Sequence, residues 1–176
     1  KFEIKLKKDD LESWDEFENE VDYLPICYSS SYADFNLAFQ KYHGGDWIDY
    51  SIIFRTQNKT IAIWPVSISF KNNQYNLSSF RVPLLPPIFS NTASKKNRKK
   101  VIYDLNKILK FICDKLKIKE KFLNSYFPFF NSPGLPLWFA MHTNQLQKLR
   151  VEYDLFLDIN TNLDEIKKNF RKSYKP

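Results

Sequence analysis

The chain has 176 residues, of which 43% are hydrophobic and 17% aromatic, so it suits one domain with a packed core and is unlike a disordered chain. Its formal net charge is +7, but residues 1–24 hold 4 Lys against 9 Asp and Glu, so the basic surplus belongs to the rest of the chain. With 3 glycines and 2 cysteines, the sequence excludes glycine-rich phosphate loops, a Gly-x-Ser-x-Gly nucleophile motif and a disulfide scaffold.

The first 45 residues predict one strand followed by two helices. Residues 2–6 alternate apolar and polar side chains, as a short strand does. An acidic first turn that begins at Asp9 predicts a helix ending before Pro25. Three serines at 29–31 offer the N-cap of a second helix, which Gly44-Gly45 closes.

Three consecutive antiparallel strands are predicted next. Apolar and polar residues alternate over residues 47–57, 60–70 and 74–80, with turn residues between them. Pro65 marks a bulge or an unpaired position, because proline has no backbone N–H to donate. A proline-rich connection at residues 81–90 follows the third strand.

The second half of the chain begins with the clearest helix of the sequence. Apolar residues recur every three or four positions from Val101 to Leu116. The later predicted elements are a strand at 121–127, a helix near 137–149, a strand at 150–159 and a final helix from about 163. The order β-α-α-β-β-β-α-β-α-β, followed by a helix, predicts a mixed α/β fold in which the long helix makes a right-handed parallel crossover.

This order resembles the GNAT N-acyltransferase fold, and particular stretches resemble the N-terminal half of FemABX-like acyltransferases. Residues 153–159 and 163–175 are similar to the strand and basic helix that join the two tandem GNAT-like halves of that family. Ile63-Trp64-Pro65-Val66-Ser67 and residues 83–89 resemble the strand and the proline-rich loop of its first half. The resemblance extends over residues 28–176.

The resemblance implies that residues 1–160 form a GNAT-like domain and residues 161–176 a junction helix leading to a second, absent half. It implies the acceptor-side half of an acyl- or aminoacyltransferase acting on bacterial cell-envelope glycan or peptidoglycan precursors, inactive alone. The second half would bind the donor, acyl-CoA or aminoacyl-tRNA. No cofactor is expected in this chain, because the glycine-free loop at 81–94 cannot build a pyrophosphate cradle. An unpaired half would expose an apolar face, so self-association is a further hypothesis.

A candidate substrate site lies where the proline-rich connection meets the predicted sheet. Arg81 supplies a cation, Tyr75 a hydroxyl, and Trp64 and Phe89 flat apolar surface. This mixture suits an anionic ligand such as a nucleotide-linked glycan or a peptidoglycan precursor. Packing of the same loop for stability is the alternative interpretation.

A second candidate site is the basic run that opens the long helix. Lys95, Lys96 and Arg98 stand where the helix dipole disfavours cations, so a bound anion would relieve their repulsion. A solvated basic face is the alternative interpretation. Nucleic acid is not the favoured partner, because the aromatic residues share strand faces with Ile and Val and form no RNA-recognition motif.

The residue inventory predicts no catalytic side chain and no metal site. His43 and His142 are far apart, and neither stands at a ligand spacing from Cys27 or Cys113. The alternative function is therefore a non-catalytic, GNAT-shaped binding module for an anionic polymer or a protein. No apolar run approaches the roughly 20 residues of a membrane span, and a cytoplasmic location is expected.

Overall fold

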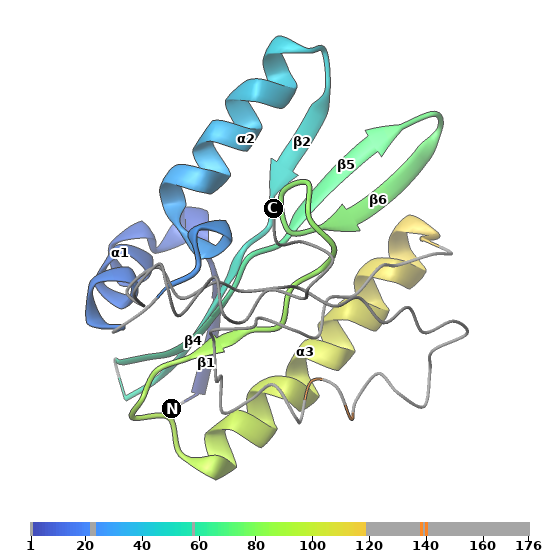
Figure 1. The fold of residues 1–176 in the computed structure, drawn as a ribbon. Helices are drawn as coiled ribbons and strands as arrows, with labels where there is room; N and C mark the ends of the chain where they lie inside the picture. Colours follow the sequence, from blue (N-terminus) through green and yellow to red (C-terminus); the bar gives the residue numbers. More distant parts are fainter. Residues whose placement is uncertain (1, 22–23, 58, 119–137, 139, 141–176) are drawn as a thin grey trace, which may run out of the picture. The chain divides into compact units, whose positions relative to one another are not determined.

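The computed structural model describes residues 2–21, 24–57, 59–118, 138 and 140, all of which belong to the unit Lys1–Leu146 (Figure 1). The protein is a mixed α/β chain with antiparallel strands and helices. The described elements are β1 (Phe2–Leu6), α1 (Leu11–Glu20), α2 (Ser30–Tyr42), β2 (Asp46–Asp49), β3 (Ile52–Thr56), β4 (Lys59–Trp64), β5 (Ser67–Lys71), β6 (Gln74–Ser78), β7 (Ile88–Phe89) and α3 (Lys95–Leu116), with 3-10 turns at Lys7–Asp9 and Ile26–Tyr28.

The first strand and the three helices of this region confirm the predictions. The Ser29 hydroxyl accepts a hydrogen bond from the backbone N–H of Tyr32 at 3.2 Å, which caps α2 as expected. After α2, Gly44 adopts a φ of +71°, a left-handed conformation that ends the helix. The predicted elements after residue 118 lie outside the described residues, and so do the parallel crossover and the boundary at residue 160.

The prediction of two long strands at residues 47–57 and 60–70 was wrong in one respect, because each is divided in two. The first breaks at Tyr50 and Ser51, and the second at Pro65 and Val66. Pro65 lies between the two strands and takes no part in strand pairing, as its missing N–H predicts. The two breaks face each other: Tyr50 N–H donates to Val66 C=O at 2.9 Å, and Val66 N–H donates to the Ser51 hydroxyl at 3.2 Å. The chain bends at this point from one sheet into another.

Two antiparallel sheets result from these bends. One has four strands in the order β1-β3-β4-β7, and the other has three in the order β2-β5-β6. The two-residue strand β7 lies within the proline-rich connection at residues 81–90, where no strand was predicted. In Figure 1 the β5–β6 hairpin projects away from the four-stranded sheet.

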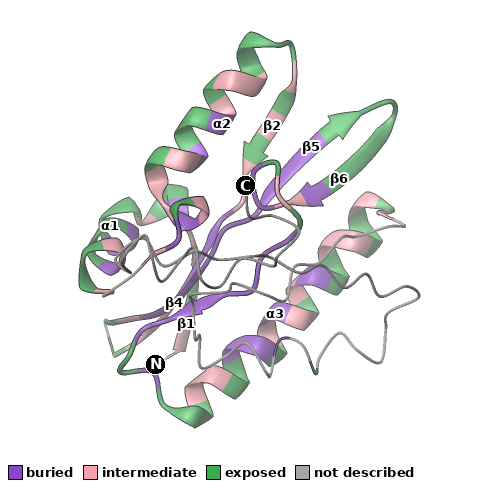
Figure 2. Cartoon of the chain, viewed as in Figure 1, coloured by how far each residue is buried: buried purple, intermediate pink, exposed green. Residues whose placement is uncertain are grey.

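The four-stranded sheet is buried on both faces. On β4, Ile63 packs with Trp14 and Phe17 of α1, while Trp64 packs with the buried side of α3, including Leu105. Neighbouring residues of a strand point to opposite faces, so alternation along β3 and β4 separates the two clusters. Figure 2 shows this buried strand region with exposed residues along the outer sides of the helices.

Two buried hydrogen bonds attach the proline-rich connection to this core. Trp64 Nε1 donates to the carbonyl of Leu85 at 2.8 Å, and the Tyr28 hydroxyl donates to the carbonyl of Pro86 at 2.6 Å. Burial raises the pKa of Tyr28 well above its usual value, so the hydroxyl remains a donor. The connection is therefore held in one path by its carbonyl groups, although its prolines donate nothing.

An ion cluster fixes the start of α1 to the first two strands of the sheet. Asp10 accepts from Lys5 Nζ at 2.8 Å and from Arg55 Nη1 at 2.6 Å. The hydrogen bond from Lys5, followed by those from Ser13 and Arg55, holds the pKa of Asp10 well below its usual range. Asp10 is therefore a charged acceptor shared by β1 and β3.

Among the described helices, none combines the length and the apolar character needed to span a bilayer.

We expect Trp64→Ala to lower the free energy of unfolding by ~3–5 kcal/mol, because it opens a cavity and leaves the Leu85 carbonyl without its donor. Phe111→Ala is the matched control, since Phe111 is 67% exposed on α3. Chemical denaturation of both variants checks this expectation. A cost of less than 1 kcal/mol for Trp64→Ala would contradict the assignment of Trp64 to the core.

We expect Asp10→Asn to lower the free energy of unfolding by about 1 kcal/mol at neutral pH, because it removes the charged acceptor of the hydrogen bonds from Lys5, Ser13 and Arg55. The lowered pKa of Asp10 stabilises the folded state above the unfolded pKa of about 3.9, and this contribution is lost as the pH falls below that value. Urea denaturation between pH 7 and 3 should therefore show the difference between the variant and the natural chain beginning to narrow below about pH 4, because the folded carboxyl becomes protonated only well below its usual pKa. The exposed Asp114→Asn serves as control, and a pH-independent difference for Asp10→Asn would refute the ionic explanation.

Candidate functional site

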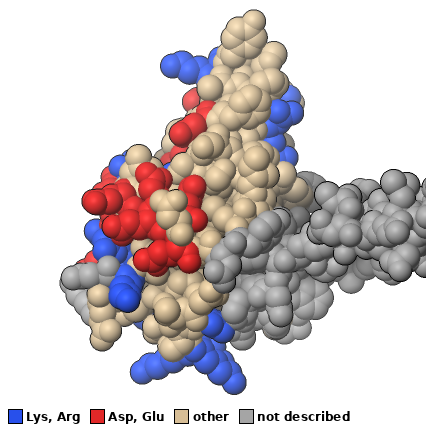
Figure 3. Space-filling view, turned by 60° about the vertical axis from the view of Figure 1, so that its left-hand side comes forward, with Lys and Arg blue, Asp and Glu red and all other residues tan. Residues whose placement is uncertain are grey.

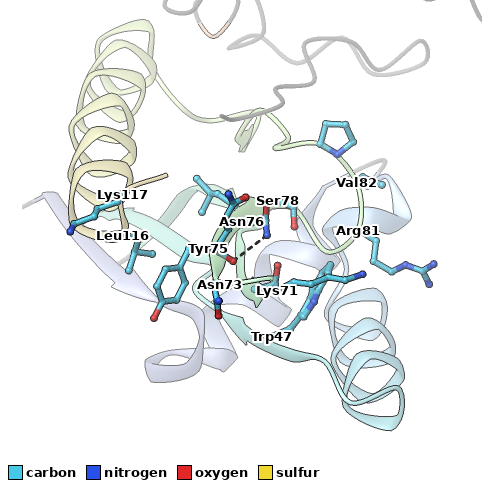
Figure 4. Close-up of a pocket in the computed structure, with 14 residues that line it drawn as sticks. Trp47, Lys71, Asn73, Tyr75, Asn76, Ser78, Arg81, Val82, Leu116 and Lys117 are labelled. Carbon is cyan, nitrogen blue, oxygen red and sulfur yellow. Dashed lines mark hydrogen bonds between the residues drawn. The ribbon is translucent and has the colours of Figure 1, made fainter. Parts of the chain in front are cut away.

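An open groove of about 980 Å³ lies beside the β5–β6 hairpin. Its lining comes from β2, from this hairpin, from the turn that follows β6 and from the end of α3. Figure 4 shows Leu116 and Lys117 on one side, Trp47 and Arg81 on the other, and Tyr75 between them. Segments far apart in the sequence thus contribute to one concave surface.

The groove is cationic. Lys71, Arg81 and Lys117 line it, and none of its lining residues in the described chain is Asp or Glu. The ion pairs among the described residues involve other cations, namely Lys5, Lys7, Arg55 and Lys100. The rest of the lining supplies neutral donors and acceptors, from Asn73, Gln74, Asn76, Ser69 and Ser78, with the rings of Trp47 and Tyr75. Such a surface favours an anionic ligand rich in hydroxyl or amide groups.

Arg81 is held in a strained turn. Phe80 and Arg81 have φ values of +51° and +71°, and Ser79 N–H donates to the Val82 carbonyl at 3.1 Å across the turn. Left-handed backbone costs a residue with a Cβ roughly 1–2 kcal/mol. Two such residues in succession require compensating contacts from the surrounding structure.

Side-chain hydroxyls supply those contacts. The Ser79 hydroxyl donates to the Pro65 carbonyl at 2.5 Å and accepts from Leu85 N–H at 3.0 Å. Phe80 N–H donates to the Ser67 hydroxyl at 3.1 Å, and the Tyr32 hydroxyl donates to the Phe80 carbonyl at the same distance. The backbone beneath Arg81 is therefore fixed before any ligand arrives.

The guanidinium group of Arg81 also has a defined neighbour. Its Cζ lies 4.8 Å from the centre of the Phe39 ring on α2, which is a cation–π distance. A ring leaves the N–H groups of arginine free to donate in the plane of the guanidinium. Arg81 is thus oriented by a ring, and no ion pair joins it to a carboxylate of the described residues.

The structure brings two of the four predicted substrate-binding residues together. Arg81 and Tyr75 both line the groove, and the Tyr75 ring is 43% exposed beside Phe70, with 4.9 Å between ring centres. Trp64 and Phe89 are 0% and 3% exposed and do not line it. Core packing accounts for both rings, and their role in binding a substrate stays a prediction. Trp64 stands in an apolar run on the core face of its strand, a signal that already favoured packing.

The basic run at the start of α3 is a separate surface. Lys95, Lys96 and Arg98 follow the N-cap Ser94, whose hydroxyl accepts from Asn97 N–H at 3.2 Å. The groove instead includes Lys117, which ends the same helix of 22 residues. At 1.5 Å per residue the two ends are roughly 30 Å apart. The predicted anion site on Lys95, Lys96 and Arg98 is thus independent of the groove.

Sequence reasoning missed Lys71, Lys117 and Trp47 as groove residues. Lys71 precedes Asn72 and Asn73, whose φ values of +52° and +59° form the hairpin turn. That turn was predictable, but the bend that moves the hairpin out of the main sheet was not. Lys117 reaches the groove only through the length and direction of α3, which no local pattern reveals.

Acidic residues gather elsewhere. Helix α1, with the sequence LESWDEFENE, carries acidic side chains and no basic one, and the exposed ones include Glu12, Asp15 and Glu16. Figure 3 shows acidic side chains collected in one patch of the surface, with lysine and arginine mostly at its margins. The charge asymmetry of the sequence therefore becomes a spatial separation of charges.

Metal ligation and thiol chemistry have no site in the described residues. No cluster of three His, Cys, Asp or Glu side chains is found there. The His43 ring lies 4.4 Å from the ring of Phe39, and Cys27 is not part of a disulfide. Burial raises the pKa of Cys27 to about 11, so it is a neutral thiol at pH 7 and a poor nucleophile.

Comparisons of the chain with models of protein families, with curated proteins and with solved structures gave no match.

We expect Arg81→Gly to be more stable than Arg81→Ala by about 1 kcal/mol, because glycine adopts a φ of +71° without the clash of a Cβ. Both variants lose the same guanidinium, so the comparison isolates the backbone strain. Thermal and urea denaturation measure the difference. Equal stability, or a more stable alanine variant, would contradict the strained turn.

Proposed function

We propose that this chain is the acceptor-binding half of a FemABX-like acyl- or aminoacyltransferase that acts on bacterial cell-envelope glycan or peptidoglycan precursors. The observation that carries the proposal is the groove, where Arg81 and Tyr75 meet Lys71 and Lys117 without a carboxylate among the described lining residues. These precursors combine phosphates or carboxylates with sugar hydroxyls and amides. The groove offers a partner for each of these groups.

Each kind of lining residue has a distinct part in this function. Arg81 can donate two parallel hydrogen bonds to a phosphate or carboxylate, and its fixed turn sets their direction. Lys71 and Lys117 add charge without that directional demand. Asn73 and Asn76 can donate to and accept from sugar hydroxyls, while Trp47 offers a flat surface to a sugar ring.

The proposed reaction is attack of an acceptor amine on an activated acyl carbon. In this reaction the chain described here positions the acceptor, and positioning alone lowers the barrier of a two-substrate reaction. The donor, acyl-CoA or aminoacyl-tRNA, would bind to the second half. The connection after β6 supports this division, because Pro83, Pro86 and Pro87 provide no N–H groups for a pyrophosphate.

The alternative function is a non-catalytic binding module for an anionic polymer or a protein. It is favoured by one specific observation: the described groove lining contains no His, Cys, Asp or Glu, the side chains that most readily act as a general base at neutral pH. An acyl-transfer assay with the product of the complete gene separates the two functions. Turnover with an acyl-CoA or an aminoacyl-tRNA supports the enzyme, whereas binding of the anionic ligand without turnover supports the module.

We expect a nucleotide-diphosphate-linked aminosugar, such as UDP-N-acetylglucosamine, to bind the chain and N-acetylglucosamine alone to bind at least tenfold more weakly. Arg81→Gln and Lys117→Gln should each weaken the nucleotide sugar about tenfold, which corresponds to ~1.4 kcal/mol. Lys110→Gln is the matched control, because Lys110 is exposed on α3 outside the groove. Calorimetric titration at two salt concentrations gives the affinities. Binding that ignores Arg81 and Lys117 would refute the groove as the acceptor site.

A further inference from the structure

The groove contains an edge strand of a β-sheet, as far as the described residues define that sheet. β6 is the outer strand of the order β2-β5-β6, and Tyr75, Asn76, Leu77 and Ser78 all line the groove. A strand edge presents unpaired N–H and C=O groups that can bind an added strand. The groove is therefore able to recognise a peptide main chain as well as separate charges.

The register of the hairpin identifies the free main-chain groups. A two-residue turn, Asn72-Asn73, joins β5 to β6, so the closing pair Lys71–Gln74 is hydrogen-bonded. Antiparallel pairs alternate, which makes Tyr75 and Leu77 members of non-hydrogen-bonded pairs. Their N–H and C=O groups consequently point away from β5, and no hydrogen bond from another described residue reaches them.

The other edges of the two described sheets are protected. β1 carries Glu3 and Lys5, and β7 is only two residues long and buried. β2 carries Asp46 and Asp49, and α2 packs against it. β6, with the sequence QYNLS, has neither charge nor proline, the devices that usually block strand addition. Among the described edges it is thus the one without these devices; Tyr75 and Asn76 are exposed on it, and Leu77 is 6% exposed with its side chain in the core.

Cations stand near both ends of this edge. Lys71 is paired with Gln74 at the start of β6, and Arg81 lies three residues beyond its end at Ser78. Lys117 approaches from α3 on the side of the groove opposite Arg81 (Figure 4). Since the described lining has no carboxylate, an acidic peptide is complementary to it and a basic peptide is not.

We propose that the groove binds an extended acidic peptide, which adds to β6 as a further strand through the main-chain groups of Tyr75 and Leu77. The inference rests on the proposed function, because it assigns the peptide portion of an acceptor to the same groove. Five residues of β6 accommodate a bound segment of about five residues, at roughly 3.3 Å each. Hydrogen bonds between the two main chains provide the affinity for the peptide. Lys71, Arg81 and Lys117 favour a peptide with acidic side chains.

The test uses a capped heptapeptide that alternates glutamate and valine, with a lysine-for-glutamate peptide as the charge control. We expect the acidic peptide to bind at least tenfold more tightly. N-methylation of the valines and of the glutamates, in two separate peptides, then probes the main chain. Because only alternate residues of an added strand face β6, one methylated peptide should lose at least tenfold in affinity and the other less than threefold.

Amide hydrogen exchange in the natural chain provides a readout that needs no variant. We expect the acidic peptide to slow exchange at Tyr75 and Leu77 by tenfold or more, and to change Asn76, which already bonds to β5, far less. Equal effects of the two methylations, or no slowing at Tyr75 and Leu77, would overturn strand addition. Slow exchange at both amides before peptide is added would also overturn it, because the edge would already be occupied.

Comparing the nucleotide sugar with the peptides, together with charge variants of the chain, distinguishes this inference from the proposed function. If UDP-N-acetylglucosamine binds and depends on Arg81 while the two methylated peptides remain equivalent, strand addition is wrong and the acceptor groove stands. If neither the nucleotide sugar nor the acidic peptide binds, both proposals are wrong. Lys71→Gln should weaken the acidic peptide at least fivefold, and Lys110→Gln should leave its affinity unchanged.

Discussion

The arrangement of the described region depends on a pair of hydrogen bonds between two chain bends. Tyr50 N–H donates to the Val66 carbonyl, and Val66 N–H donates to the Ser51 hydroxyl, beside a proline that can donate nothing. Without such bonds the buried backbone at the bends would lack partners, which is costly in a core. With them, a continuous hairpin is divided between two sheets. The diverging β5–β6 hairpin then leaves space beside it, and the groove lies there, lined by β2, the hairpin, the turn after β6 and the end of α3.

The same divergence explains which parts of the structure the sequence predicts. Helices α1, α2 and α3 follow from local signals, since an N-cap serine, a closing glycine and a regular apolar stripe each act within a few residues. The strands follow from alternation, but alternation is unchanged when a strand bends into a second sheet. Pro65 indicated an irregularity, and only the hydrogen bonds that surround it determine what kind.

The candidate site was predictable to the extent that it depends on charge and turn chemistry. Arg81 and Tyr75 were predicted because they supply a cation and a hydroxyl where the proline-rich connection meets the sheet. The burial of Trp64 and Phe89 was not predictable from residue type, because an aromatic ring is equally suited to a core and to a ligand, and burial is a property of the whole fold. Lys71 and Lys117 are about 45 positions apart in the sequence, and their convergence needs the hairpin and the helix together.

Two features of the groove, the strained turn at Arg81 and the uncharged edge of β6, are each unfavourable for the chain on its own. A positive φ at Arg81 lowers the stability of the fold, and substitution of Arg81 by glycine would remove this cost. An edge strand without protective charge lowers solubility, and a lysine on β6 would remove that cost. Surrounding hydroxyls instead hold the strained turn in place, and the acidic side chains of α1 lie on a different surface from the cations of the groove. A cation fixed on a rigid turn gives up little conformational freedom when it binds an anion. The edge strand β6 is likewise already ordered before a main chain pairs with it. The fixed Arg81 and the ordered β6 therefore both favour recognition of an extended anionic ligand at a low entropic cost.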